Sequence, residues 1–197
     1  MKKQDIVLAI FAGVGVAYLA MGFIKDLASR FAGVGLASYV VLPLLAIFGL
    51  WLAELIGKKF LFVLQAAKFV LIGIVATLVD LGVLSVLMGI TGFIAGAGYA
   101  AMKGISFVVA TTFKYPLNKF MAFEQNSKKG MLKEYITFFI VTLIGFAIDV
   151  AIATKVVGGG ALYGLSGKSW GIVGGIAGAL VVFIWNFVGY KFIVFKK

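Results

Sequence analysis

Long apolar runs separated by short polar or glycine-rich segments dominate the pattern of this chain. Each run is long enough to cross a hydrocarbon core of about 30 Å, because a helix rises about 1.5 Å per residue. The fold class that this pattern predicts is an all-α integral membrane protein. The six expected transmembrane helices cover residues 6–23, 31–56, 69–88, 99–117, 135–157 and 170–190.

The N-terminal run invites comparison with a secretory signal peptide. It is longer than the apolar segment of a typical signal peptide, Asp5 interrupts its basic start, and residues 17–20 offer no A-x-A cleavage site. We therefore interpret it as a retained span that forms a helical hairpin with the second span, over residues 1–57. Residues 58–68 have basic ends and an apolar face, which predicts a short interfacial linker helix.

The remaining residues, 69–197, carry the same pattern twice. Each copy has a lone aspartate eleven residues after a phenylalanine, Asp80 in the first copy and Asp149 in the second, and each copy ends in Lys-Phe-x-x-Phe. Two spans per copy mean that both copies enter the membrane in the same direction, so the pattern predicts a four-helix unit of two tandem, equally oriented repeats. The predicted repeats are residues 69–123 and 135–195.

Composition excludes a soluble protein. With 63% hydrophobic residues, 13% charged residues and a mean hydropathy of +1.14, the chain has too little polar surface to cover a soluble globule. It contains no cysteine and no histidine, so we expect no disulfide, no metal site and no cofactor. The net charge of +11 is better explained by lysines that flank membrane spans than by a nucleic-acid partner.

The positive charges also predict an orientation. Most of the 18 lysines and arginines fall at the N-terminus, in the second and fourth loops, and in the C-terminal segment. Since Lys and Arg are enriched in cytoplasmic loops, both termini should be cytoplasmic in a multi-pass protein of the plasma membrane.

The two aspartates are the main candidates for a functional site. A carboxylate near the bilayer centre costs about 2.5–3.5 kcal/mol on insertion scales, so Asp80 and Asp149 each need a partner, a proton or a task. One interpretation is that each is held by a neighbouring Lys, Ser or Thr and only orders the helices. The other is that the pair lines a polar cavity, where it binds sugar hydroxyls or changes protonation.

Cations and amides in the even-numbered spans add a second group of candidates. Lys103 and Lys114 share one helix face about 16 Å apart, where they either extend to opposite interfaces or form a ladder for a phosphate. Four further residues cluster at the cytoplasmic ends of these spans, where they can hold a lipid phosphate or anchor the helix at the headgroups. These are Asn118, Lys119, Asn186 and Lys191.

Together these residues resemble the GtrA-like family of four-span membrane proteins over residues 68–195. The segments KFVLIGIVATLVDLGVLSVL and AMKGISFVVATTFKYPLNKFMAF carry the resemblance, followed by a weaker second copy that ends NFVGYKFIVF. The family commonly has Asn where the first copy has Lys114, and the second copy supplies it as Asn186. The second copy has Gly175 in place of Lys103, and the first two spans lie outside the family's usual unit.

The resemblance implies a role in cell-surface polysaccharide or glycoconjugate synthesis. We expect a translocase for a polyprenyl-phosphate-linked sugar, in which Lys119, Lys191 and Lys114 hold the phosphate and the two aspartates bind sugar hydroxyls. Two alternatives remain open: a non-transporting subunit that docks a glycosyltransferase through the charged loop 119–134, and a proton-coupled exporter of small cations that titrates at Asp80. We do not expect the chain to be an enzyme. The first two helices either cover the repeat bundle or form a contact between copies in a homo-oligomer.

Overall fold

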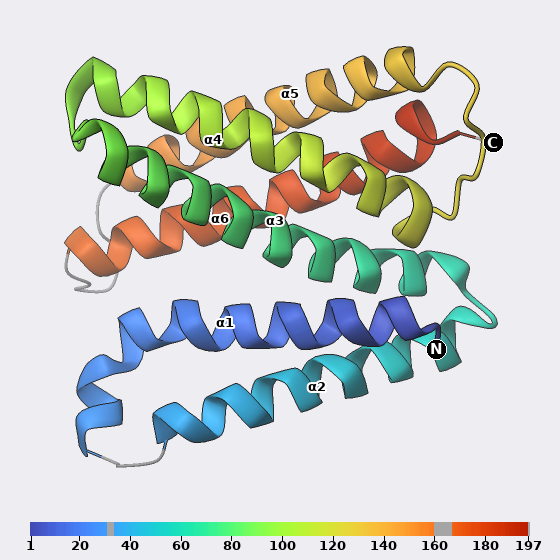
Figure 1. Cartoon of the computed structure of the whole chain (residues 1–197), viewed down its shortest axis with the longest axis horizontal. Coiled ribbons are helices and arrows are strands. Elements are labelled where there is room, and N and C mark those ends of the chain that lie inside the picture. The colour runs from blue at the N-terminus through green and yellow to red at the C-terminus, as the bar shows by residue number, and fades with distance from the viewer. Residues whose placement is uncertain (31–33, 160–166, 197) are drawn as a thin grey trace. The chain divides into compact units, whose positions relative to one another are not determined.

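The computed structural model describes the backbone of residues 1–30, 34–159 and 167–196, and their side chains except at 22–30, 34 and 167–172. Over these residues the regular structure is helical throughout, as the sequence predicts (Figure 1). Two short π-helices, η1 and η2, continue the fourth and sixth α-helices. The elements are α1 Lys3–Arg30, α2 Val34–Gly57, α3 Leu61–Thr91, α4 Gly96–Leu117, η1 Asn118–Ala122, α5 Met131–Gly158, α6 Gly167–Gly189 and η2 Tyr190–Val194.

Five helical stretches in the described residues are long and apolar enough to cross a membrane. They establish a multi-pass membrane protein. The helix outside this group is α4, which has 22 residues and therefore sufficient length, but Lys103 and Lys114 lower its hydropathy. The five stretches are Lys3–Met21, Gly35–Gly57, Leu61–Thr91, Met131–Gly158 and Val173–Val194.

The first two helices pack closely through small residues. A Cβ atom at Gly13 would lie only 2.5 Å from Pro43 N, so α1 and α2 can approach each other here only because position 13 is glycine. Pro43 lies inside α2, which continues on both sides of it. The alanines Ala9, Ala12 and Ala17 of α1 are fully buried, and α1 contacts both α2 and α3.

The predicted linker helix over residues 58–68 is not a separate element. Residues 61–91 form one helix of 31 residues, so the expected linker becomes the first turns of α3. The sequence between Lys59 and Ile72 contains neither Gly nor Pro, so nothing interrupts the hydrogen-bond ladder where the amphipathic segment meets the apolar one. Gly92, in the left-handed conformation with φ 71°, ends α3 and begins the expected glycine-rich turn to α4.

Both π-helices occupy the same place in the two sequence copies. Each contains the lysine of the Lys-Phe-x-x-Phe pattern, and each is closed by a backbone bond from the pattern's last phenylalanine: Phe123 N to Asn118 O at 2.9 Å, and Phe195 N to Tyr190 O at 2.8 Å. Pro116 precedes η1, but Val188 stands at the matching place before η2, so proline does not cause the π geometry. The feature that both copies share is the Lys-Phe-x-x-Phe sequence itself.

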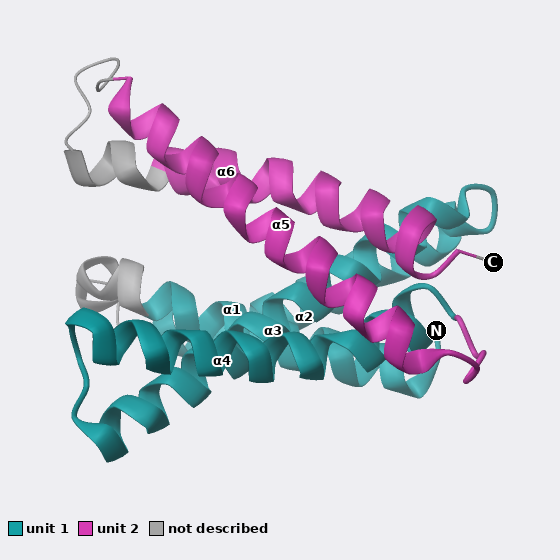
Figure 2. Cartoon of the chain, turned by 90° about the horizontal axis from the view of Figure 1, so that it is seen from above, with its two compact units in different colours: residues 1–124 teal, residues 125–197 magenta. Residues whose placement is uncertain are grey.

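The chain divides into two compact units after Glu124 (Figure 2). The first unit, Met1–Glu124, contains α1 to α4 and η1, and the second, Gln125–Lys197, contains α5, α6 and η2. This division differs from the expected boundary near residue 57, because α1 and α2 both pack against α3. The N-terminal hairpin therefore shares one helical bundle with the first sequence copy.

Candidate functional site

Asp80 is held by two side chains of the neighbouring helix. It lies on α3 and forms an ion pair with Lys103 of α4 through Oδ2. Ser106 donates a hydrogen bond from Oγ to Asp80 Oδ1 at 2.7 Å, and the serine is fully buried. Both carboxylate oxygens are thus engaged, and the charge of Asp80 is balanced by a cation on the next helix.

Ser106 was not among the candidates predicted from the sequence. Its position three residues after Lys103 is a usable signal, because residues at i and i+3 of a helix project from the same face. A lysine and a serine at this spacing can hold the two oxygens of one carboxylate. These contacts with a lysine and a serine are of the kind that the helix-ordering interpretation of Asp80 expects.

The second aspartate has different surroundings. Under the alignment that pairs Lys119 with Lys191, Gly175 and Gly178 of α6 stand in the places of Lys103 and Ser106. Asp149 of α5 lies directly over Gly178, and no donor among the described residues reaches its buried Oδ1 atom. The two aspartates therefore occupy matching sequence positions but differ in hydrogen bonding. Both oxygens of Asp80 have a partner, whereas Asp149 Oδ1 accepts no hydrogen bond from the described residues.

The end of α4 gathers the remaining candidates of the first copy. Asn118 and Lys119 are fully buried, and Asn118 donates from Nδ2 to the backbone oxygen of Lys114 at 3.0 Å. Lys119 Nζ lies 5.9 Å from the ring centre of Tyr115, and Lys114 Nζ lies 5.4 Å from that of Phe69. These distances fit cation–π contacts, which favour an ammonium group that has lost part of its water.

The corresponding end of α6 is more aromatic. Tyr190, which replaces Asn118, stacks on Phe138 with ring centres 4.3 Å apart and shares a hydrogen bond of 2.5 Å with Thr142. Asn186 lies against Gly145, where a Cβ atom would be 2.7 Å from Asn186 Oδ1. Lys191 lies 5.8 Å from the ring centre of Phe187 and is partly exposed. Buried lysine and amide groups are therefore concentrated in the first copy.

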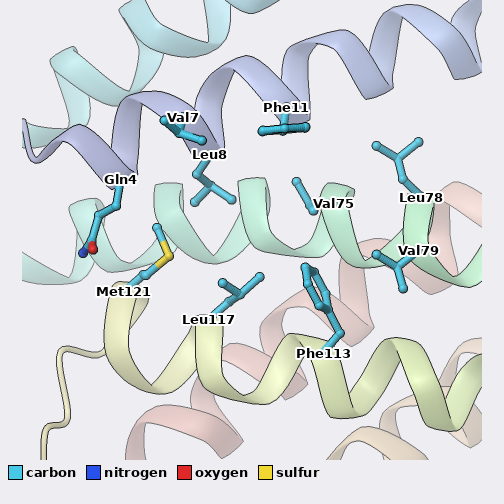
Figure 3. A pocket seen from close by; sticks show the side chains of 10 residues that line it. All are labelled: Gln4, Val7, Leu8, Phe11, Val75, Leu78, Val79, Phe113, Leu117 and Met121. Atoms are coloured by element: carbon cyan, nitrogen blue, oxygen red, sulfur yellow. The ribbon is translucent and has the colours of Figure 1, made fainter.

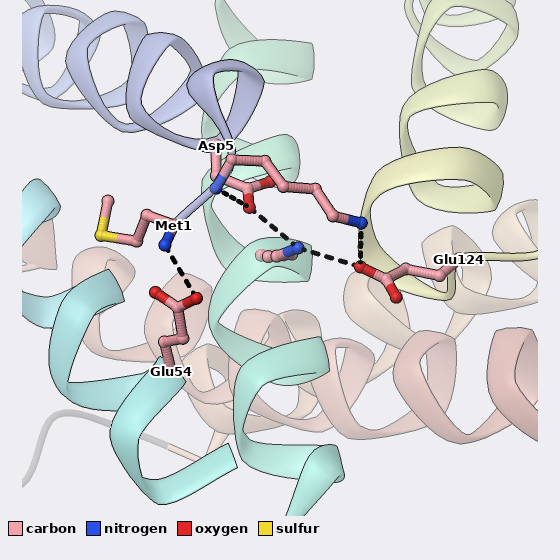
Figure 4. Close-up of polar contacts among 6 residues, drawn as sticks. Met1, Asp5, Glu54 and Glu124 are labelled. Carbon is pink, nitrogen blue, oxygen red and sulfur yellow. Dashed lines mark hydrogen bonds and ion pairs between the residues drawn. The ribbon is translucent and has the colours of Figure 1, made fainter. Parts of the chain in front are cut away.

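A charged network at one end of the first unit was not predicted (Figure 4). Lys68 Nζ lies 3.1 Å from Asp5 Oδ2 and 3.5 Å from Glu124 Oε1, and Lys2 Nζ lies 2.8 Å from the same Glu124 oxygen. The hydrogen bond with Lys2 holds the pKa of Glu124 below its usual value, and the same bond raises the pKa of Lys2. The network joins α1, the start of α3 and the segment after η1.

The family comparison agrees with the resemblance found in the sequence. The GtrA/DPMS transmembrane domain matches residues 68–195. The chain belongs to this family. Its matched region begins at Lys68 of the charged network and ends at Phe195, which closes η2. Comparison with curated proteins and with solved structures gives no match.

Membership confirms the family that the sequence resembles, and it ties this membrane protein to polyprenyl-phosphate sugar metabolism. The matched region includes every predicted site residue, from Asp80 to Lys191. Helices α1 and α2, and the residues of α3 that precede Lys68, lie before the matched region, as expected from the sequence. The helical hairpin of residues 1–57 is therefore an addition to the family domain.

Proposed function

We propose that this protein is a flippase that moves a polyprenyl-phosphate-linked sugar across the plasma membrane for cell-surface polysaccharide or glycoconjugate synthesis. In this proposal all six helices cross the bilayer, the two repeats share one orientation, and both termini are cytoplasmic. The chain carries the substrate without changing it chemically. Family membership supports the substrate class.

The observation that carries the proposal is the unsatisfied carboxylate oxygen of Asp149. Its buried Oδ1 atom has no donor among the described residues, although buried polar atoms are normally hydrogen-bonded. A sugar hydroxyl is a donor of the right kind. Ionisable groups inside membrane spans commonly mark the path of a substrate, so Asp149 is the better placed of the two aspartates to receive the sugar.

Asp80 is less available than Asp149 for binding the sugar. Because Lys103 and Ser106 already occupy its oxygens, a sugar hydroxyl has to compete with both. Within the proposal, Asp80 and Lys103 bind the sugar only by exchanging their mutual contact for contacts with the substrate. The same engagement of Asp80 disfavours the cation-exporter alternative, which needs a carboxylate that is free to gain and lose a proton.

The lipid phosphate is proposed to bind at the ends of α4 and α6. At the first end, Asn118 and Lys119 supply buried amide and ammonium groups and Lys114 a partly exposed ammonium; at the second end, Asn186 supplies a buried amide and Lys191 a partly exposed ammonium. A phosphate recruits such donors through charge-assisted hydrogen bonds, which are about twice as strong as neutral ones. The greater burial of the first set favours it as the tighter phosphate site.

The experiment is reconstitution of the full chain in liposomes with a polyprenyl-phosphate-linked sugar on one side. An impermeant probe reads the appearance of the sugar on the other side. We expect movement above that of empty liposomes, and we expect Asp149→Asn, which keeps the shape of the side chain, to reduce the rate by about tenfold, the equivalent of one hydrogen bond to a charged group. Transport by folded Asp149→Asn protein at the wild-type rate would remove Asp149 from the mechanism.

A second candidate function is docking of a glycosyltransferase. It is favoured by Lys128, Lys129 and Lys133, which are exposed in and just after the loop that precedes α5 and form no ion pair within the described part of the chain. Replacing all three with Gln should abolish co-purification with the enzyme if the loop is the dock. A folded wild-type chain that moves no lipid-linked sugar but retains such a partner would favour docking over transport.

A further inference from the structure

The first unit contains an apolar cavity of about 700 Å³ that the proposed function does not yet use (Figure 3). It lies between α1, the middle of α3, and the end of α4 with η1. Nine of the ten side chains that line it are apolar, and the polar one is Gln4. Its volume falls within the range of about 300–1,000 Å³ that is typical of small-molecule sites.

One wall of this cavity comes from outside the family domain. Val7, Leu8 and Phe11 of α1 face it, whereas the matched region begins only at residue 68. The hairpin is tied to the matched region by the buried pair of Asp5 and Lys68. The N-terminal hairpin thus completes a cavity that the domain alone would leave as an open face of α3 and α4.

The cavity opens toward the side of the bundle. Val7, Phe11 and Phe113 line it and are 51%, 62% and 40% exposed. Because α1 and α3 are candidate membrane spans, the medium at this side is hydrocarbon and not water. An apolar cavity does not hold ordered water, which needs polar partners, so the ligand that suits it is a hydrocarbon chain.

The polar surroundings lie at one end. Gln4 stands between Lys2 and the network residue Asp5 on α1, and Leu117 and Met121 flank Asn118 and Lys119 at the end of α4. Figure 3 shows Gln4 and Met121 at the same end of the cavity, away from Leu78 and Val79. Lys2 and Lys68 of the charged network and Lys119 of η1 contribute cations to this part of the first unit. The site therefore suits an amphiphile with an anionic head at the lysines and an apolar tail along α1.

We propose that this cavity binds the isoprenoid chain of the polyprenyl-phosphate carrier, in the segment next to the phosphate. This assignment rests on the proposed function, which supplies the class of lipid, and on the charge at the polar end. The cavity extends about 10 Å along α1 from Gln4 to Phe11. It therefore holds the first part of the chain, while the remainder stays in the bilayer.

The first test is photocrosslinking of the full wild-type chain in phospholipid vesicles. The probe is a polyprenyl phosphate that carries a diazirine in an isoprene unit near the phosphate. We expect fragment mass spectra to place the adducts on α1 between Gln4 and Phe11 and on α3 between Val75 and Val79. Adducts confined to other helices would overturn the proposal, and this readout does not depend on the folding of any variant.

Two tryptophan variants of α3 provide a matched comparison. Val75→Trp fills the cavity, whereas Val86→Trp makes the same change at a position of the same helix that is 59% exposed and does not line the cavity. We expect Val75→Trp to lower the crosslinking yield by about tenfold, which corresponds to about 1.4 kcal/mol of binding, and Val86→Trp to leave it near that of the wild type. Equal yields from the two folded variants would contradict the assignment.

Further measurements distinguish an isoprenoid site from a general lipid site, and test the cavity separately from the proposed transport. A large excess of anionic phospholipid that abolishes the crosslink would show a general lipid site and would overturn the commitment to an isoprenoid. Crosslinking at the cavity without any translocation would reject the flippase while the cavity assignment stands. Translocation with adducts placed elsewhere would reject the cavity and leave the flippase in place.

Discussion

Lys68 Nζ and Asp5 Oδ2 lie 3.1 Å apart, and their side chains are only 3% and 5% exposed. This pair joins the added N-terminal helix to the first residue of the family domain. Breaking a buried ion pair is costly because the remaining charge loses its partner, typically by about 3–5 kcal/mol. The contact thus links α1, which forms one wall of the cavity, to α3, and losing one of its two charges should weaken this link.

The first prediction concerns this pair. Lys68→Met should lower the free energy of unfolding in detergent by about 3 kcal/mol, because it leaves Asp5 charged and buried. The exposed Lys128→Met is the control and should change it by less than about 0.5 kcal/mol. The double variant with Asp5→Asn should recover part of the loss. A Lys68→Met protein as stable as Lys128→Met would show that the pair does not hold the hairpin.

The two aspartates should respond oppositely to the same substitution. Asp80→Asn leaves Lys103 without its counter-charge, so it should cost about 1–3 kcal/mol of unfolding free energy. Asp149→Asn removes a charge whose buried oxygen has no described donor, so its stability should be equal to or above that of the wild type. Denaturant unfolding of both variants, measured beside their transport rates, checks this. Equal losses of stability would contradict the difference between the two sites.

The contact between Lys2 and Glu124, at the exposed end of the charged network, predicts that the stability of the fold depends weakly on pH. The hydrogen bond with Lys2 lowers the pKa of Glu124 from 4.5, so its contribution to stability is present above pH 4.5 and is lost as the pH falls through the lowered value. Lys2, whose pKa is raised from 10.5, loses its contribution as the pH rises through the raised value. The side chains are 58% and 47% exposed, so the effect should stay below about 1 kcal/mol and fade in high salt.

Glu124→Gln tests this pH dependence. Its unfolding midpoint should fall less than that of the wild type when the pH is lowered from about 6 to 3, because the titrating carboxylate is gone. The same comparison in about 1 M salt should bring the two curves together. Parallel acid curves at low salt would show that the contact between Lys2 and Glu124 contributes nothing measurable to stability.

The helices and the family were predictable from the sequence because hydropathy and spacing are local properties. The apolar runs predict the helices, and the order of Asp80, Lys103, Asn118 and Lys119 indicates the family. The continuity of α3 through residues 61–68 was missed because an amphipathic start and an apolar continuation can belong to one helix. The π-helices were also missed. Each is a single turn that continues an α-helix, and the hydropathy pattern of so short a segment does not distinguish a π turn from an α turn.

The partners of the charged side chains could not be predicted in the same way. Asp5 and Lys68 are far apart in the chain, and only the packing of α1 on α3 brings them together. The different states of Asp80 and Asp149 depend on Ser106 and Gly178, whose roles become visible only when the helix faces are known. The roles of the eight predicted site residues stay predictions, and the experiments above address them.

Two glycines one turn apart on α6 give the sharpest test of how Asp149 is placed. A Cβ atom at Gly178 would lie 2.9 Å from the backbone oxygen of Asp149, whereas no described atom lies within 4 Å of a Cβ at Gly175. Gly178→Ala should therefore destabilise the pair of α5 and α6 by about 1–3 kcal/mol, as overpacking does, and should displace the carboxylate and slow transport. Gly175→Ala should be neutral or stabilising by up to about 1 kcal/mol, because alanine favours the helix. Unfolding and transport measured on both variants decide the matter: equal behaviour would mean that Asp149 does not lie on Gly178 in the membrane.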